Sequence, residues 1–162
     1  MITIGIDPGV SGGIAVFHER AGHVEIHTLK FADKTEADVA KWLRGFCLGG
    51  ESPMCYLEQV GAAGGGPLGR RQGANSMFTF GKSYGFLRGV LVALGIPFED
   101  VRPAKWLHAM GLKGIKDEGQ TAKKNRHKQK AQQLFPHVKL THATADAILL
   151  AEYARRMERG EK

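Results

Sequence analysis

Two apolar runs in the sequence each end in a carboxylate, and these acids are the first candidates for chemistry. Asp7 follows a β-branched run, and Glu58 follows a second apolar run at 54–57. Because alternate side chains of a strand point to opposite faces, Asp7 shares a face with Thr3 and Gly5, which are small enough for a ligand to approach. Acids at strand ends are typical of ligand sites in open α/β sheets, and a turn aspartate that caps its own loop is the alternative.

A third carboxylate, Asp146, belongs to a helical pattern near the end of the sequence. It shares one helix face with His142, Leu149, Leu150 and Tyr153. This stripe should press against a sheet, where a buried carboxylate requires a cation, a metal ion or a proton. The alternative is an aspartate near a helix start, where the helix dipole favours negative charge.

The acids would meet at one edge of the sheet if the two acid-tipped strands are parallel neighbours. Asp7, Glu58, Asp146 and His142 would then offer oxygen and imidazole ligands, which suit Mg²⁺ or Mn²⁺ better than zinc. Beside a basic surface, such a cluster is typical of two-metal phosphodiester hydrolysis. One ion activates water in this reaction, and the other stabilises the leaving oxygen.

Strand and helix patterns together account for most of the sequence, and they must position these residues. The 162 residues are expected to form one domain. The predicted strands are 2–6, 14–17, 23–29, 54–57 and 98–101. The predicted helices are 35–48, 75–94, 102–110, 120–135 and 141–156, and Thr141 is the expected N-cap of the last one.

Two glycine-rich stretches each have two interpretations. The segment 61–73 carries Arg70 and Arg71 but lacks the phosphate-loop pattern, so no nucleotide cofactor is predicted. It is either a simple connector or a basic loop that orders on a phosphate backbone. The helix at 75–94 presents a smooth groove, which would pack either on its own sheet or on a second subunit. The residues at spacings of four that form it are Gly73, Met77, Gly81, Gly85 and Gly89.

Positive charge is in excess and is concentrated in one segment. Lys and Arg outnumber Asp and Glu by 23 to 16, which gives a net charge of +7, and the isoelectric point is near 9.6. Such a balance favours a polyanionic partner. Residues 102–130 contain most of this bias, with only Asp117 and Glu118 as acids, and also contain His108 and His127. A charge run of one sign is unusual for an ordinary solvated face.

Several classes of protein are disfavoured by the sequence. No apolar run approaches the roughly 18 residues of a membrane span, and Asp7 interrupts the apolar start that a signal peptide would need. Cys47 and Cys55 lack the spacing of a redox or zinc motif, so both are expected to be reduced core residues. We therefore expect a cytoplasmic protein without membrane contact.

Short motifs in a fixed order make the sequence similar to a known family over nearly its whole length. It resembles the RuvC-type Holliday junction resolvases of the ribonuclease H-like superfamily, most closely their phage branch. The motifs that carry the resemblance are Ile-Gly-Ile-Asp-Pro-Gly (4–9), Leu-Glu-Gln-Val (57–60), Phe-Gly-Lys-Ser-Tyr-Gly (80–85), Arg-Pro-Ala-Lys-Trp (102–106), Leu-Phe-Pro (134–136) and Ala-Asp-Ala-Ile-Leu-Leu-Ala (145–151).

The resemblance implies both a fold and an activity. The fold would be α/β and ribonuclease H-like, with a mixed five-stranded sheet flanked by helices in a single nuclease domain over 1–162. The activity would be that of a crossover junction endodeoxyribonuclease, in which a homodimer makes paired nicks in four-way DNA junctions. Each active site would use two Mg²⁺ or Mn²⁺ ions. The protein would work in the cytoplasm of a bacterium, or of a host cell if a phage encodes it.

The resemblance also assigns metal ligands residue by residue. It puts Asp7, Glu58 and Asp146 in the metal site. The fourth acid or histidine of the family lies three residues before the last aspartate, where this sequence has Ala143. His142 is one residue earlier and on the helix face of Asp146, so we take it as the candidate fourth ligand.

Groups that contact DNA follow in the same way. Some relatives carry an aromatic wedge just after Glu-Gln-Val, where this sequence has Gly61, so another group would have to open the junction. Lys105 and Lys124, or Lys123 in its place, are similar to the family's catalytic or backbone-contacting lysines. The full set expected to bind DNA is Arg70, Arg71, Lys82, Arg102, Lys105, Lys113, Lys116, Lys123, Lys124, Arg126 and Lys128.

Three other functions are compatible with parts of the pattern. A nuclease of the same fold could act on flaps, forks or RNA–DNA hybrids. A small-molecule kinase or actin-like ATPase also uses an Asp-x-Gly turn but needs a duplicated domain, which 162 residues cannot hold. A non-catalytic DNA-binding domain would gain nothing from three acids, since they repel a polyanion.

Overall fold

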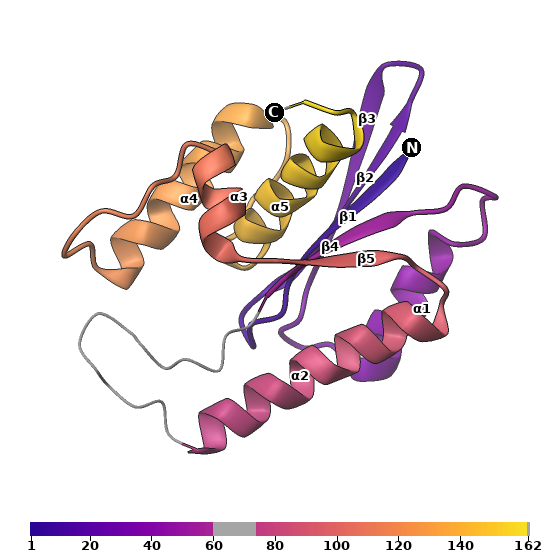
Figure 1. Ribbon diagram of the computed structural model, residues 1–162, viewed down its shortest axis with the longest axis horizontal. Helices are drawn as coiled ribbons and strands as arrows, with labels where there is room; N and C mark the ends of the chain where they lie inside the picture. Colours follow the sequence, from indigo (N-terminus) through magenta and orange to yellow (C-terminus); the bar gives the residue numbers. More distant parts are fainter. Residues whose placement is uncertain (60–73, 162) are drawn as a thin grey trace.

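One mixed sheet organises the molecule, whose computed structural model describes residues 1–59 and 74–161 (Figure 1). The strand order is β3-β2-β1-β4-β5. β1 pairs antiparallel with β2 and parallel with β4, and β5 extends the sheet in parallel to β4. The strands are β1 (Ile2–Asp7), β2 (Gly13–Arg20), β3 (His23–Lys30), β4 (Met54–Glu58) and β5 (Phe98–Val101).

Helices cover both faces of this sheet. α1 and α2 lie on one face, and α3, α4 and α5 lie on the other (Figure 1). In the described residues the helices are α1 (Glu36–Gly45), α2 (Ala74–Ala93), α3 (Pro103–Ala109), α4 (Gln120–Leu134) and α5 (His142–Glu158). The expected mixed five-stranded sheet flanked by helices is therefore confirmed.

Element boundaries differ from the sequence-based expectations by only a few residues. β2 continues to Arg20, beyond the expected end at 17, and α1 ends at Gly45 although apolar residues continue the helical pattern to 48. The N–H groups of Phe46 and Cys47 bond to carbonyls only three residues earlier, so the last turn tightens and the helix stops. α5 continues to Glu158, two residues beyond the expected end. Its N-terminus is the predicted one, because the Thr141 hydroxyl accepts the N–H of Thr144.

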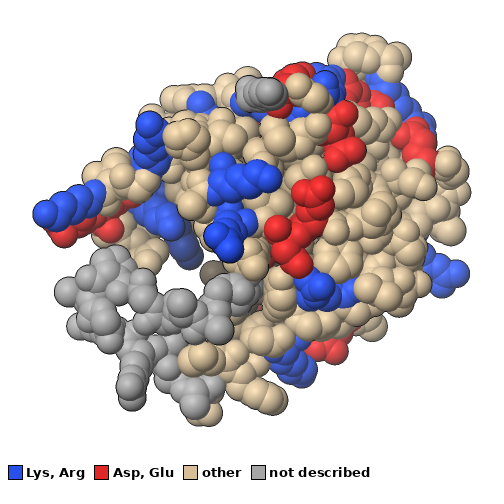
Figure 2. Space-filling view, viewed as in Figure 1, with Lys and Arg blue, Asp and Glu red and all other residues tan. Residues whose placement is uncertain are grey.

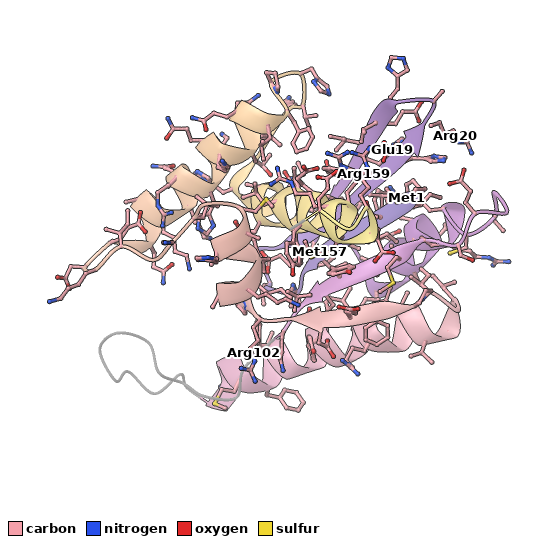
Figure 3. The ribbon with its side chains drawn as sticks, turned by 45° about the horizontal axis from the view of Figure 1, so that its top comes forward. Met1, Glu19, Arg20, Arg102, Met157 and Arg159 are labelled. Carbon is pink, nitrogen blue, oxygen red and sulfur yellow. The ribbon has the colours of Figure 1, made fainter. Side chains whose placement is uncertain are left out.

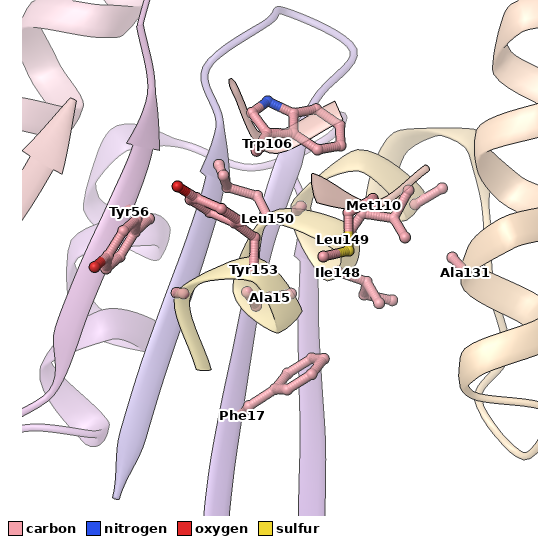
Figure 4. Packing of buried hydrophobic residues seen from close by; sticks show 14 of the residues in the cluster. Ala15, Phe17, Tyr56, Trp106, Met110, Ala131, Ile148, Leu149, Leu150 and Tyr153 are labelled. Carbon is pink, nitrogen blue, oxygen red and sulfur yellow. The ribbon is translucent and has the colours of Figure 1, made fainter. Parts of the chain in front are cut away.

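The period-two alternation of β1 produces two separate cores. Ile2, Ile4 and Ile6 are buried in the core that α1 and α2 cover. On the opposite face of the sheet, side chains of β2, β4 and β5 join a second core under α3, α4 and α5, where Trp106 and Tyr153 are among the largest buried side chains (Figure 4). β1 is thus buried on both faces, which fits its central place in the sheet.

Gly5 lets α5 approach β1 so closely that their backbones touch. A Cβ atom at Gly5 would lie 2.3 Å from the Ala147 carbonyl oxygen and 2.3 Å from the Ala151 nitrogen. Only a glycine facing an alanine-lined helix permits this distance. The contact fixes where along β1 the helix lies, and therefore where Asp146 lies.

The far end of α5 is held against the sheet by polar contacts. Arg159, just after the helix, forms an ion pair with Glu19 at the end of β2 (Figure 3). The Tyr56 hydroxyl of β4 donates to Glu158 Oε1 at 3.1 Å. These contacts and the Gly5 contact fix the orientation of α5 relative to β1 and β4.

The glycine face of α2 is not used for packing inside this chain. A Cβ atom at Gly81, Gly85 or Gly89 would meet no described atom within 4 Å. Phe78 and Val92 on the same helix are 76% and 70% exposed. Of the two interpretations, packing on the protein's own sheet is therefore wrong for these glycines. Gly73 and the segment 61–73 lie outside the described residues.

The remaining expectations from composition concern cysteines and membranes. Cys55 is buried in the α1–α2 core as expected, whereas Cys47 is only partly buried. Among the helices of the described residues, none combines the length and apolar character needed to cross a membrane.

Candidate active site

The parallel pairing of β1 with β4 brings the first two acids together. Ile6 of β1 is in register with Leu57 of β4, and Asp7 and Glu58 are the next residues of the two strands. Because the strands run in the same direction, both carboxylates lie at the same edge of the sheet. The prediction that these two strands are parallel neighbours is confirmed.

The turn after β1 is shaped around the Asp7 side chain. Asp7 Oδ1 accepts the N–H of Gly9 at 3.0 Å. A Cβ atom at Gly12 would lie 2.8 Å from the Asp7 carboxyl carbon, so only glycine leaves room for the carboxylate. The Ser83 hydroxyl of α2 donates to the Pro8 carbonyl at 3.1 Å and ties the turn to that helix.

The start of α5 lies over this same edge. A Cβ atom at Gly13 would lie 3.1 Å from the carbonyl oxygen of Ala143. Asp146 is one turn further along the helix and affects the pKa of both Asp7 and Glu58 through its charge. The charges of Asp7, Glu58 and Asp146 therefore lie within electrostatic reach of one another.

Burial and mutual repulsion oppose ionisation of these acids. Burial is the main cause that raises the pKa of Glu58 to about 8, and the charges of Asp7 and Asp146 raise it further. The pKa of Asp7 is also raised, first by burial and then by Asp146, against the opposing effects of the Gly9 N–H and Lys124. A divalent cation among the three carboxylates would remove this conflict, because it favours their charged forms.

The donor chemistry fits a hard divalent metal, but the described residues do not form a finished cage. Three carboxylates without cysteine are the ligand type of Mg²⁺ and Mn²⁺. Across residues 1–59 and 74–161, however, no three His, Cys, Asp or Glu side chains converge closely enough to hold an ion as they stand. The predicted set of Asp7, Glu58, His142 and Asp146 is thus not preassembled, and its carboxylates would have to turn inward around a metal.

Among the described residues, His142 forms no hydrogen bond or ion pair with any of the acids. It is the first residue of α5 and is exposed, and its Nε2 lies 2.9 Å from Oδ1 of Asn125 on α4. Since an amide oxygen only accepts, Nε2 donates in this bond. The position of Asp146 on the sheet-facing side of α5 agrees with the sequence pattern, whereas His142 lies at the outer rim, and its role as a ligand remains a prediction.

Two residues that sequence reasoning did not select contact the acids directly. Trp106 Nε1 of α3 donates to Glu58 Oε1 at 3.3 Å. His127 Nδ1 of α4 lies 2.7 Å from Asp146 Oδ1. A signal for His127 was available, because His127 and Ala131 are one turn apart and form the buried face of α4.

The basic segment borders the acids, as far as the described residues show. Lys123 affects the pKa of Glu58 and Lys124 that of Asp7, in both cases by lowering it. Both lysines are exposed, as is Lys105 on α3. Figure 2 shows Lys and Arg side chains on this side of the molecule. Positive charge thus lies within electrostatic reach of the acids.

The other residues expected to bind DNA have varied surroundings. Arg126 forms a two-point ion pair with Glu118, with nitrogen–oxygen distances of 2.8 and 2.7 Å, so its charge is already compensated. Lys82 of α2 lies 3.7 Å from Glu36. Arg102 projects where β5 meets α3 (Figure 3). Lys113 and Lys116 are exposed and Lys128 is partly buried, whereas Arg70, Arg71 and Gly61 lie outside the described residues.

Comparison with known proteins identifies the fold. No model of a protein family matches the sequence, and no curated protein matches it. Among solved structures, Thermus thermophilus RuvC in complex with a Holliday junction substrate superimposes with a TM-score of 0.62 at 17% identity, over 99% of this chain and 96% of that one. A second structure of Thermus thermophilus RuvC gives a TM-score of 0.54 at 16% identity, over 99% and 97% of the two chains. The chain therefore has the fold of RuvC, and similarity to a phage branch remains a prediction.

Proposed function

We propose that this protein is a divalent-metal-dependent DNA endonuclease that resolves four-way junctions by paired phosphodiester hydrolysis. The observation that supports this most directly is that Asp7 and Glu58 lie at one edge of a RuvC-type sheet, within electrostatic reach of Asp146. Acids in mutual repulsion are costly to keep, and they are most simply explained as ligands of cations. The basic residues of α3 and α4 beside them supply the complementary surface for a polyanion.

Each group in the site has a proposed task. Asp7, Glu58 and Asp146 would hold two Mg²⁺ or Mn²⁺ ions, and His142 would be a further ligand from the rim. The ions would supply an activated water and stabilise the charge on the leaving oxygen. Lys124 and Lys105 would orient the scissile phosphate and offset its negative charge. The Gly9 N–H fixes one Asp7 oxygen, so that the other is left free to face a metal.

A solved neighbour and the α2 surface support the substrate and the assembly that we propose. The solved neighbour holds a Holliday junction substrate, and we propose that branched DNA is also the substrate of this chain. A junction presents two symmetry-related strands, which a two-fold dimer would match. The exposed α2 face with Gly81, Gly85 and Gly89 is the surface we propose for the dimer contact. The site of action would be the cytoplasm of a bacterium or of a phage-infected cell, where such DNA is found.

Cleavage of a substrate panel tests this proposal. The panel consists of a synthetic four-way junction, a fork, a flap, a duplex and an RNA–DNA hybrid, each with Mg²⁺ and with Mn²⁺. We expect symmetrical cuts in the junction and much slower cutting of the other substrates. Preferential cutting of the flap, fork or hybrid would transfer the proposal to that substrate, and binding without cutting in either metal would identify a non-catalytic DNA-binding domain.

Substitution of the acids shows whether they carry the reaction. Asp7→Asn, Glu58→Gln and Asp146→Asn should each reduce cleavage by several orders of magnitude. Junction binding in EDTA should be equal or tighter, because less negative charge faces the phosphates. Glu99→Gln is the matched control, since Glu99 is an exposed carboxylate on β5. Substantial turnover by one of the three variants would remove that residue from the metal site.

A further inference from the structure

Two aromatic residues from α3 and α4 reach across to two of the acids. Trp106 Nε1 donates to Glu58 Oε1 at 3.3 Å, and His127 Nδ1 lies 2.7 Å from Asp146 Oδ1. The two rings also contact each other edge to face, with centroids 6.1 Å apart and planes at 72°. The four side chains form a continuous chain from β4 through α3 and α4 to α5.

Burial shows on which side of the carboxylate the imidazole lies. The His127 side chain is 3% exposed, whereas the Asp146 side chain is 25% exposed. The histidine therefore lies behind the carboxylate, and Asp146 presents its accessible side to the site. An arrangement in which His127 faced a metal with Asp146 behind it would require the opposite order of exposure.

The hydrogen bond also fixes the protonation pattern of the histidine ring. An ionised carboxylate only accepts, so the proton of the shared bond belongs to Nδ1. Nε2 is buried and has no hydrogen-bond partner among the described residues. His127 thus makes two contacts: a hydrogen bond from Nδ1 to Asp146, and an edge-to-face ring contact with Trp106.

We propose that Trp106 and His127 are positioning residues, which set the orientation from which the Glu58 and Asp146 carboxylates turn to bind a divalent metal. The assignment of a metal role to the acids rests on the proposed function. Hydrogen-bonded groups behind metal ligands orient them, and their loss typically weakens metal affinity or activity by about 10- to 100-fold. The acids are not closed into a metal cage as they stand, so the direction in which each carboxylate is held determines how far it must turn.

The helices that carry this pair also carry the lysines proposed to contact DNA. Lys105 precedes Trp106 on α3, and Lys123 and Lys124 lie one turn before His127 on α4. The two sets of residues nevertheless have separate tasks, because the lysines are exposed and the aromatic pair is buried. Changes to the pair should alter metal binding without DNA, whereas changes to the lysines should alter DNA binding without metal.

Metal affinity measured in the absence of DNA is the decisive readout. Titration calorimetry with Mn²⁺ on the full chain compares wild type with His127→Leu, which removes the donor, and with His127→Asn, whose amide N–H lies near the place of Nδ1. We expect His127→Leu to bind Mn²⁺ about 10-fold more weakly or worse, and His127→Asn to recover most of the loss. Junction binding in EDTA should stay within about twofold of wild type for both.

The cleavage rate measured at increasing Mn²⁺ concentration distinguishes weaker metal binding from a general loss of activity. For His127→Leu, half-maximal cleavage should shift to a higher Mn²⁺ concentration by the factor seen in calorimetry, with partial recovery of the rate at saturation. His137→Leu is the matched control, because His137 is exposed beyond the end of α4. Should His127→Leu fail to fold, Trp106→Phe keeps an aromatic ring and removes the N–H together with the five-membered ring, and Trp42→Phe on α1 is the control for the lost volume.

The outcomes distinguish this proposal from the proposed function. A folded His127→Leu protein, or a folded Trp106→Phe protein where the first does not fold, with wild-type Mn²⁺ affinity would overturn the positioning role. Wild-type protein that binds Mn²⁺ but cuts no branched substrate would instead overturn the nuclease function. In that case a loss of affinity in His127→Leu would still support the positioning role.

Discussion

Glu58 is held where several groups oppose its ionised form. Burial, Asp7 and Asp146 raise its pKa to about 8, although the Trp106 N–H and Lys123 act in the opposite direction. At neutral pH without metal, this carboxylate is therefore largely protonated, while an added cation would favour the charged form. Metal binding at this residue should release a proton, which makes the apparent metal affinity rise with pH.

The same pKa predicts how the metal-free protein depends on pH. The folded-state pKa of Glu58, about 8, lies above the ordinary 4.5, so the folded state binds the proton more tightly than the unfolded state. This contribution to stability is full below pH 4.5 and is lost as the pH rises through about 8. In EDTA at pH 8.5, the free energy of unfolding of Glu58→Gln should therefore be higher than that of wild type by roughly 1–3 kcal/mol. This range is smaller than ~1.4 kcal/mol per pKa unit would give, because Glu58 is partly exposed to solvent.

Urea unfolding from pH 4.5 to 8.5 in EDTA measures this difference. The difference in unfolding free energy between Glu58→Gln and wild type should shrink toward pH 4.5, where both the glutamate and the glutamine side chain are neutral in the folded protein. Glu99→Gln, which changes an exposed carboxylate of β5, should show no such trend. A Glu58→Gln advantage that is constant over this range would show that ionisation of Glu58 does not oppose folding.

Individual residues were predictable from the sequence where local pattern determines their place. Asp7 and Glu58 end apolar strands, and Asp146 lies on the apolar stripe of a helix, so all three follow from short-range periodicity. Trp106 and His127 were missed because their partners are 48 and 19 residues away in the sequence. The His142 position shows the limit of the pattern, since a helix face wide enough to include it also reaches solvent.

At the scale of elements, the contact between α5 and β1 controls the distance between Asp146 and the strand-borne acids. Gly5→Ala would place a Cβ atom 2.3 Å from backbone atoms of Ala147 and Ala151, so α5 must move away. We expect a loss of roughly 1–3 kcal/mol in unfolding free energy, or more, because backbone cannot yield as a side chain does. Mn²⁺ affinity should fall as well, since Asp146 moves with the helix.

Thermal unfolding and Mn²⁺ titration of Gly5→Ala check this prediction. The matched control is Gly45→Ala, in which the same methyl group is added to an exposed position of α1 with no described atom within 4 Å. That control should gain up to ~1 kcal/mol from helix propensity. Equal stability of Gly5→Ala and wild type would mean that α5 does not depend on this close approach.

α3 and α4 are expected to supply the electrostatic part of DNA affinity. Lys105, Lys123 and Lys124 are exposed on these helices beside the acids. Replacing all three with alanine should weaken junction binding in EDTA and reduce the slope of log affinity against log salt by about one unit per lost phosphate contact. Lys41→Ala on α1, on the opposite face of the sheet, should leave both quantities unchanged. An unchanged salt slope in the triple variant would exclude these lysines from the DNA contact.

Most helices and strands could be predicted because their signals are local. Alternation defined β1, and the capping residue Thr141 with the Ala-rich stripe defined α5. The partner of the α2 glycines could not be predicted, because glycines at spacings of four are compatible with any close neighbour. Only the packed sheet shows that these glycines face away from it.

At the scale of the whole molecule, the sheet separates the two surfaces for which we propose functions. The basic helices α3 and α4 lie on one face of the sheet, and α2 lies on the other (Figure 1). On α2, Phe78 and Val92 are exposed on the same helix as the open glycines. Exposed apolar side chains around a smooth backbone surface are typical of protein–protein contacts. A dimer through α2 would leave the acid edge of each subunit open to one strand of a junction.

Gly85→Leu tests the dimer without disturbing the subunit. Gly85 has no described atom within 4 Å, so a leucine fits the isolated chain, and its helix propensity should raise stability by up to ~1 kcal/mol. In a dimer the same side chain would separate the two helices. We therefore expect light scattering to show a dimer for wild type and a monomer for Gly85→Leu, with an equal or higher melting temperature. Gly45→Leu, the same change at an open position of α1, should remain dimeric.

The consequence for activity can be read on a supercoiled plasmid that extrudes a cruciform. Two coordinated cuts across the junction linearise the plasmid, whereas independent single cuts first release the supercoiling, reabsorb the cruciform and leave a nicked circle. Wild type should yield mainly linear product, and Gly85→Leu mainly nicked circles, at similar Mn²⁺ affinity because the acids lie at the sheet edge and not on α2. Wild-type protein that is monomeric both free and on a junction would exclude the dimer. A Gly85→Leu protein that stays dimeric would instead move the contact to another surface.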